Sequence, residues 1–203
     1  MIDYFAALSP SGDPAVDVEQ FYRTVDRLDT LAHVTQVAAE SLDLAARFGA
    51  DRQSTNLAAL AHDLAAVVPV DEMPAVAEDM GLLVSEADRA IPQLLHGPIA
   101  AAALGDKLAV RDEDVLNAVR YHSTLRAGAS TLEKIVFVAD KIAYDPTSPH
   151  GGEYVAAMRA ARSLDEASLV YIGFLQDYAS RYGWLVHPNA IAAHRDLAGR
   201  SVR

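Results

Sequence analysis

The sequence predicts an all-α protein built as a single helical domain, and two features of its 203 residues carry this prediction. Apolar residues make up 51% of the chain, enough for a sizeable core, and they recur mostly three and four positions apart, whereas strand-like alternation is scarce. Gly, Pro and capping residues separate these apolar stretches, as they do between helices. No repeat or change in composition divides the chain. We therefore expect residues 1–15 to form a lead-in and residues 16–203 to form one domain.

The first half predicts four helices in order. A loose lead-in is followed by a long helix over residues 16–48, which Gly49 ends. Asp51 is the expected N-cap of a second helix that runs to about residue 68, before Pro69. A short helix over residues 73–79 and a loop containing two prolines then lead to a helix that begins near Pro98.

The second half predicts four more helices. The stretch "RDEDVLNAVRYH" begins with acidic residues, which favour a helix N-terminus, and Ser130 precedes Glu133 at the spacing of a capping box. The stretch "DPTSPHGG" indicates a loop. A long helix over residues 153–182 and a short one after Pro188 complete the expected set.

The composition limits the partners and the location. The net charge is −11, so neither nucleic acid nor an anionic membrane is an expected partner, and a polyanionic substrate would need bound metal ions to supply positive charge locally. The chain has no cysteine, which excludes thiolate metal sites and fits a reducing cytoplasm. The acidic N-terminus does not resemble a signal peptide, and no apolar run is long enough to span a membrane. We expect a cytoplasmic protein.

Several polar residues lie inside apolar helical patterns. In "LAALAHDLAAV", His62 and Asp63 interrupt a helix that is apolar nearly all round, and burying both is costly unless each finds a partner. A single inward His is usually a hydrogen-bonded core residue, but a group of such residues favours a divalent metal. The candidate ligands are His33, His62, Asp63, His96, His122 and Asp140. Asp63, with two oxygens, can bridge two ions. The other histidines, His150, His187 and His194, are expected at the surface or as caps.

The order of these six residues resembles the HD-domain superfamily of metal-dependent phosphohydrolases. The segments "AALAHDLA", "LLHGPIAA", "AVRYHST" and "STLEKIVFVADKI" are similar to its YqeK branch, the bacterial symmetrical bis(5′-nucleosyl)-tetraphosphatases, and so is the tail "YGWLVHPNAIAAHRDL". The resemblance covers roughly residues 25–198.

The resemblance implies an HD-type helical bundle with a buried centre of two divalent metal ions. Iron is the favoured ion, with manganese, magnesium or another divalent ion as alternatives. The implied reaction is hydrolysis of diadenosine tetraphosphate to two ADP by a metal-bound hydroxide, with a small-molecule nucleotide as the partner. The implied metal ligands are the same six residues, with Asp63 as the catalytic bridge.

The resemblance also implies substrate contacts from Thr124, Arg126 and Lys134. Pairing with a nearby acid is the alternative for Lys134, and a solvated loop is the alternative for the other two. The chain departs from the family pattern at Ala66, where many HD proteins have Lys, and at Ala143 and Asp145, which replace an expected Glu and Arg. An HD phosphohydrolase for another nucleotide, or a metal-holding regulatory protein without turnover, are therefore the alternatives. The oligomeric state is left open, a homodimer included.

Overall fold

The computed structural model describes residues 2–143 and 152–200. Within these residues the chain forms eleven α-helices and two 3₁₀ helices, and no strand, which confirms the all-α prediction. The elements are α1 (Pro14–Thr24), α2 (Leu28–Phe48), α3 (Arg52–Ala61), η1 (Leu64–Val67), α4 (Met73–Asp79), α5 (Glu86–Ala90), η2 (Pro92–Leu95), α6 (His96–Leu108), α7 (Glu113–Tyr121), α8 (Thr131–Ile142), α9 (Gly152–Ala160), α10 (Leu164–Tyr182) and α11 (Pro188–Arg200).

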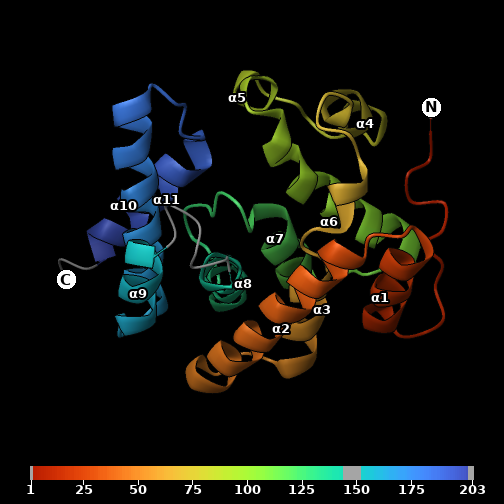
Figure 1. Ribbon diagram of the computed structural model, residues 1–203, viewed down its shortest axis with the longest axis horizontal. Helices are drawn as coiled ribbons and strands as arrows, with labels where there is room; N and C mark the ends of the chain where they lie inside the picture. The colour runs from red at the N-terminus through yellow and green to blue at the C-terminus, as the bar shows by residue number, and fades with distance from the viewer. Residues whose placement is uncertain (1, 144–151, 201–203) are drawn as a thin grey trace.

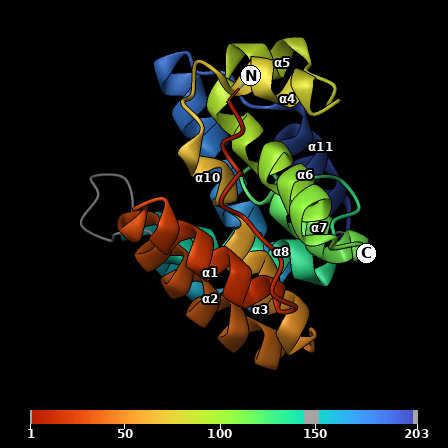
Figure 2. The ribbon, with the colours of Figure 1, turned by 90° about the vertical axis from the view of Figure 1, so that its right-hand side faces the viewer.

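Helix α8 lies between two hydrophobic cores. In Figure 1, α1, α4 and α6 lie on one side of the molecule and α9–α11 on the other, with α7 and α8 between them. Leu132 and Val136 of α8 pack into the core formed by the earlier helices, whereas Ile135 and Val138 pack into the core formed with α9–α11. The helix therefore joins both halves of the domain. A view from the side shows α1–α3 at one end, α4 and α5 at the other, and α6 between them (Figure 2).

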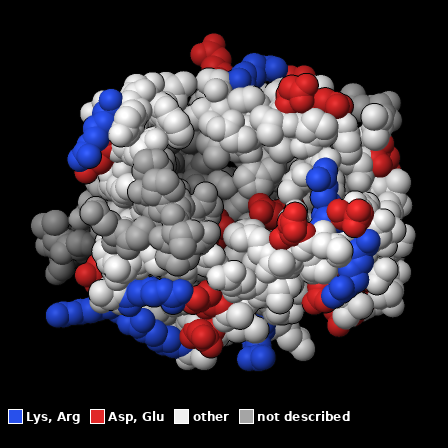
Figure 3. Space-filling view, in the orientation of Figure 1, with Lys and Arg blue, Asp and Glu red and all other residues white. Residues whose placement is uncertain are grey.

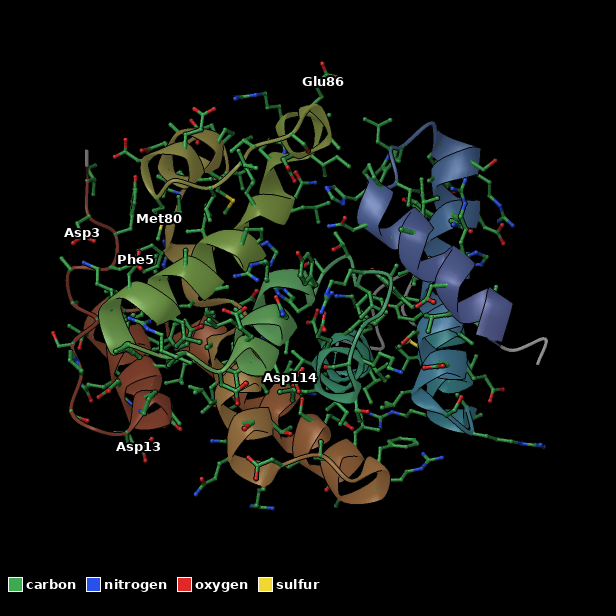
Figure 4. The ribbon with its side chains drawn as sticks, turned by 180° about the vertical axis from the view of Figure 1, so that it is seen from behind. Asp3, Phe5, Asp13, Met80, Glu86 and Asp114 are labelled. Carbon is green, nitrogen blue, oxygen red and sulfur yellow. The ribbon has the colours of Figure 1, made fainter. Side chains whose placement is uncertain are left out.

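The N-terminal lead-in is packed rather than loose. Phe5 and Leu8 are buried in the first core, and the Lys107 ammonium on α6 pairs with the Asp3 carboxylate at 2.6 Å. Figure 4 shows Phe5 close to α6 on the far face of the molecule. Helix α1 then begins at Pro14, where Asp13 is the N-cap. Burial of two large apolar side chains fixes this segment to the domain.

The expected helix over residues 16–48 is two helices. The chain reverses at Asp26, whose φ of 54° is left-handed, and the Arg27 amide donates to the Tyr22 carbonyl at 2.8 Å. This closure ends α1 in the way that glycine-containing helix ends do, although no glycine signals it. It lets α1 lie on α3, where the Tyr22 hydroxyl donates to the carbonyl of Leu60.

The expected helix over residues 153–182 is also divided. Ser163 caps α10 by accepting a hydrogen bond from the Glu166 amide, and the chain turns at residues 161–163. Upstream, the loop expected before Pro98 contains α5 and η2, and α6 begins at His96. Most of the loop expected over "DPTSPHGG" lies outside the described residues.

Three local predictions are confirmed. Asp51 caps α3, the short helix spans Met73–Asp79, and Ser130 with Glu133 forms a capping box at the start of α8. Each depends on residues close together in the sequence. Among the described residues, no helix is long and apolar enough to cross a membrane.

Candidate metal centre

The six candidate ligands converge on one place from five helical segments. His33 projects from α2, His96 begins α6, His122 follows α7 and Asp140 lies near the end of α8. His62 and Asp63 come from the end of α3. Their imidazole nitrogens and carboxylate oxygens form three overlapping groups, and the atoms within each group lie within 4.8 Å of one another. We call these six residues the His/Asp cluster.

Helix α3 ends just before His62, not at residue 68 as predicted. His62 keeps helical angles, but Asp63 has φ −101° and ψ 18°, and a 3₁₀ helix begins at Leu64. Successive residues of a regular helix point about 100° apart. The change at Asp63 alters this angle, so that His62 and Asp63 both face the cluster.

The two oxygens of Asp63 face different histidines. Oδ2 lies 3.8 Å from His33 Nε2 and 3.6 Å from His62 Nε2. Oδ1 lies 3.2 Å from His96 Nε2 and 3.7 Å from His122 Nε2. Ligand atoms around one ion with bonds of about 2.1 Å lie about 3.0–3.5 Å apart. Asp63 is therefore positioned between two sets of potential ligands.

Asp140 completes the first set. Its Oδ1 lies 3.3 Å from His33 Nε2 and 3.7 Å from His62 Nε2. Its Oδ2 pairs with the neighbouring Lys141 ammonium, which also lies 5.4 Å from the ring centroid of Phe137. One carboxylate thus faces both a potential metal position and a cation.

Three of the four histidines in the cluster are oriented by the same kind of hydrogen bond. Nδ1 of His62, His96 and His122 contacts the backbone carbonyl three residues earlier in each case. A carbonyl only accepts, so Nδ1 carries the proton and the Nε2 lone pair points into the cluster. The carbonyls of Ala59 and Val119 lie in the last turn of an α-helix, where a carbonyl lacks an intrahelical partner, whereas the Gln93 carbonyl also accepts from the His96 amide. Helix ends therefore hold the rings in the orientation that metal-binding histidines adopt.

The donor atoms fit a divalent cation. His62 Nε2 is fully buried and has no hydrogen-bond partner. His96 Nε2 and His122 Nε2 lie 2.8 Å apart, and with both Nδ1 atoms protonated their lone pairs oppose each other. A cation bound by both nitrogens relieves that repulsion, and nitrogen and carboxylate donors are usual for such ions.

The ionisation of the cluster follows from its mutual contacts. Burial alone would raise the pKa of Asp63, but the surrounding histidines lower it far below its usual range. Burial likewise opposes ionisation of Asp140, yet Lys141 and the histidines hold its pKa well below the ordinary value. Burial drives the pKa of His122 down. Ionised carboxylates and a neutral imidazole are the forms that bind metals.

Close packing of α6 on α7 brings His96 to His122. A Cβ atom built on Gly97 would lie 2.7 Å from the Arg120 carbonyl oxygen and 3.1 Å from that of Val119. Only glycine allows this approach without a backbone shift. Gly97 therefore sets the distance between the two histidines that face Asp63 Oδ1.

The cluster opens into a cavity of about 590 Å³, a size that suits a small-molecule ligand. Figure 3 shows a hollow near the middle of the surface, with largely uncharged visible walls. Besides cluster residues, the cavity is lined by Ser123, Lys141, Tyr154, Tyr171, Phe174, Leu175, Tyr178 and Trp184. Among the described residues that line the cavity, Lys141 is the one lysine or arginine. Burial lowers its pKa, but Asp140 outweighs burial and holds the pKa above its ordinary value.

The three predicted substrate contacts have partners within the protein. Lys134 pairs with Asp165 at 2.6 Å, the acid pairing that was its alternative. Arg126 makes a bidentate pair with buried Glu133, and the Thr124 hydroxyl donates to a backbone carbonyl. None of the three is among the residues that line the cavity. Substrate contact stays a prediction for all three.

The histidines outside the His/Asp cluster were expected at the surface or as caps. His187 pairs with Asp88 at 3.2 Å and accepts from the Asn189 amide at the start of α11, the capping role expected for it. His150 lies outside the described residues. His194 is half-buried on α11 and is absent from the cavity lining.

Sequence reasoning missed Lys141 and the aromatic side of the cavity. Lys141 directly follows the candidate ligand Asp140, and nothing in the local sequence distinguishes it from a surface lysine. Tyr171, Phe174 and Tyr178 recur at the spacing of one helix face, which was the available signal, but such a stripe usually indicates core packing.

The helical bundle and the His/Asp cluster define a class, the all-α phosphohydrolases whose domains bind divalent metals. The family model described as "HD domain" matches residues 30–145, more than half of the chain. The chain belongs to the HD domain family, and it is a phosphohydrolase.

Two named relatives and one solved structure are similar to most of this chain. A protein of Bacillus subtilis (strain 168), named symmetrical bis(5′-nucleosyl)-tetraphosphatase, is 37% identical over 83% of this chain and 89% of its own length. A protein of Halalkalibacterium halodurans with the same name is 30% identical over 81% of this chain and 87% of its own. A crystal structure described as a predicted HD superfamily hydrolase involved in NAD metabolism, from Clostridium acetobutylicum, superposes with a TM-score of 0.76 at 28% identity, covering 84% of this chain and 89% of that one.

Proposed function

We propose that the enzyme hydrolyses dinucleoside tetraphosphates, diadenosine tetraphosphate first among them, to two nucleoside diphosphates. The observation that carries the proposal is Asp63, whose two oxygens face two histidine sets beside a cavity of nucleotide size. The names of the Bacillus subtilis and Halalkalibacterium halodurans relatives support the choice of substrate.

Two divalent ions fit the donor atoms. His33, His62 and Asp140 would hold one ion with Asp63 Oδ2, and His96 and His122 would hold the other with Asp63 Oδ1. Such ions, when bound, lower the pKa of a water molecule and neutralise phosphate oxygens. Iron is our first choice because of the family resemblance, with manganese or magnesium as alternatives.

The chain's own residues prepare the site for a polyanion. The backbone carbonyls that accept from Nδ1 keep the imidazoles aimed at the cluster, so no reorientation is needed when substrate binds. The Lys141 ammonium lines the cavity beside Asp140 and supplies positive charge toward the phosphates. The net charge of the chain is −11, so its overall electrostatic field repels a polyanionic substrate, and the Lys141 ammonium offsets part of that repulsion at the cavity.

The proposed reaction breaks the central bond of the tetraphosphate. A water oxygen forms a bond to one inner phosphorus, the bond between that same phosphorus and the central bridging oxygen breaks, and the departing ADP keeps the bridging oxygen on the other inner phosphorus. The water protons go to solvent or to the products. ADP is a good leaving group, so no strong general acid is required.

Chromatography of the products tests the proposal. The purified, metal-loaded protein should convert diadenosine tetraphosphate to ADP alone. ATP with AMP would refute symmetric cleavage.

A second candidate is an HD phosphohydrolase for another nucleotide. The description of the Clostridium acetobutylicum structure, which mentions NAD metabolism, favours including dinucleotides and mononucleotides in the same assay. Turnover of one of these without turnover of diadenosine tetraphosphate would select this candidate. The cytoplasmic location stays a prediction.

A further inference from the structure

Aromatic rings line part of the cavity into which the His/Asp cluster opens. Tyr171, Phe174 and Tyr178 lie on one face of α10, Tyr154 comes from α9, and Trp184 follows the end of α10. We call these five residues the aromatic wall. Figure 1 shows α9 and α10 together on the side of the molecule away from α6.

The rings contact one another in a row that runs outward. The centroids of Tyr154 and Phe174 are 4.8 Å apart, those of Phe174 and Tyr178 are 6.1 Å apart, and those of Tyr178 and Trp184 are 5.0 Å apart. The last pair is nearly perpendicular, at 78°. These distances and angles are typical of aromatic packing. The neighbouring rings therefore fix the indole of Trp184 in place.

Trp184 is the outer end of this row, and it is 62% exposed. The exposed ring offers a flat apolar surface that a ligand entering the cavity can cover. The ring lines the same cavity as Asp63, Asp140 and Lys141, so a molecule that covers it can also reach the polar cluster.

A nucleotide has the chemistry that matches both sides. Its base is flat and uncharged and stacks on indole and phenol rings, whereas its phosphates need cations. Stacking of a base on an aromatic side chain is sequence-tolerant, because every base presents a π-face. The cavity is lined both by the rings and by Lys141 with the donor atoms that fit metal ions, and the Lys141 ammonium lies 5.4 Å from the ring centroid of Tyr171.

We propose that Trp184, supported by Tyr178, is the stacking platform for one nucleobase of the substrate. The inference rests on the proposed function in one respect, namely that the substrate is a nucleotide. It adds the residue that binds the base, and it implies that adenine and guanine nucleotides bind similarly at this position.

Trp184 is the single tryptophan of the chain, so its fluorescence reports on the platform directly. The test uses the full-length, metal-loaded protein, excited at a wavelength where adenine does not absorb. ADP should quench the emission saturably, and GDP should do so at a similar concentration. Inorganic pyrophosphate, which has no base, should bind without comparable quenching. Absence of quenching by ADP would overturn the proposal.

The KM and kcat of variants at Trp184 provide a second measurement. Trp184→Leu should raise the KM for the dinucleoside tetraphosphate about tenfold, within the range expected for one lost stacking contact, and change kcat less than about twofold. Trp184→Phe should recover most of the affinity. Tyr182→Leu is the matched control, because Tyr182 is 60% exposed and stacks on Tyr178 but does not line the cavity. An unchanged KM in Trp184→Leu would overturn the proposal.

The two proposals fail in different ways. If diadenosine tetraphosphate is hydrolysed to ADP but ADP does not quench Trp184, the symmetric hydrolase stands and the platform is wrong. If ADP quenches but the tetraphosphate is not hydrolysed, the platform stands and the assigned substrate is wrong. Thermal unfolding of each variant, expected to match that of the parent protein, separates loss of stacking from loss of folding.

Discussion

The cavity has two sides with opposite chemistry and different structural origins. The His/Asp cluster is polar, deeply placed and built from the ends of α3, η2 and α7 together with α2 and α8. The aromatic wall is apolar, opens outward and comes from α9, α10 and the residue Trp184 beyond them. The two sides belong to the two cores that meet at α8.

The two sides of the cavity are held in place by different kinds of contact. Three of the four imidazole rings of the cluster are oriented by a backbone carbonyl three residues earlier, such as Nδ1 of His122 on the Val119 carbonyl. The aromatic wall is fixed by ring–ring packing along α10 and between α10 and the preceding helix α9, such as Phe174 on Tyr178 and Tyr154 on Phe174. The cluster supplies the potential metal ligands, so substitutions there should abolish hydrolysis. The aromatic wall contacts the substrate without holding metal, so substitutions there should weaken substrate binding.

The largest expected effect is that of Asp63→Ala. The variant removes the one carboxylate that faces both histidine sets, so turnover should fall by more than about 10³-fold, above the loss from a single transition-state hydrogen-bond donor. Metal analysis should show loss of at least one ion per chain. The control Asp79→Ala removes an exposed carboxylate on α4 and should change neither quantity. Equal losses in both variants would contradict the proposed ligand set.

Gly97→Ala tests whether helix packing sets the cluster geometry. The added methyl group meets two backbone carbonyls of α7, so α6 should shift and separate His96 from His122. We expect about a 10–100-fold loss of activity, similar to the loss of a residue that orients metal ligands. The free energy of unfolding should also fall by about 1–3 kcal/mol, the usual cost of overpacking.

The matched control for this glycine lies on the same helix. The nearest contact of a Cβ on Gly105 is 3.7 Å, an ordinary van der Waals distance, so Gly105→Ala should keep full activity. Calorimetric titration with a divalent metal gives the second measurement. If Gly97→Ala binds metal and turns over like the control, close packing does not set the cluster.

Lys141→Met affects both sides of the cavity, because the Lys141 ammonium pairs with Asp140 of the cluster and lies 5.4 Å from the ring centroid of Tyr171 in the aromatic wall. Losing a charged contact to phosphate costs about 1.5–3 kcal/mol, which corresponds to about a 10–100-fold rise in KM. Lys141→Arg should restore part of the affinity, and metal content should stay unchanged. Lys107→Met, which breaks the exposed pair with Asp3, is the control and should not affect KM. A loss of kcat with unchanged KM would instead assign Lys141 to positioning Asp140.

Features of the fold and site could be predicted from the sequence where they depend on residues close together in the chain. The six cluster residues stood out in the sequence because imidazoles and carboxylates are costly inside apolar helices. The caps Asp51 and Ser130 were predictable because they depend on neighbours within one turn. The placement of the N-terminal segment was not, because nothing local shows that Phe5 is buried.

Other features depended on information that a single sequence does not contain. The left-handed residue at the end of α1 is Asp26, and an aspartate there gives a much weaker signal than glycine. The role of Trp184 depends on α10 packing against α8, which brings the end of α10 to the cavity. Long-range packing of this kind leaves no periodic pattern that separates a binding surface from a core.

The smallest expected effects come from the helix caps of the two sides. Ser130 caps α8, which carries Asp140, and Ser163 caps α10, which carries most of the aromatic wall. Replacing either serine by alanine should lower the free energy of unfolding by about 1 kcal/mol, which lowers Tm by about 2–4 °C in a protein of this size.

Neither cap variant should change kcat or KM at 25 °C, because Asp140 lies about three helical turns beyond Ser130 and the cavity-lining rings of α10 lie two or more turns beyond Ser163. Denaturant unfolding and steady-state kinetics on the same samples check this. A rise in KM confined to Ser163→Ala would show that the start of α10 is needed to position the aromatic wall. A loss of metal confined to Ser130→Ala would show that the cluster depends on its helix start as well as on its helix ends.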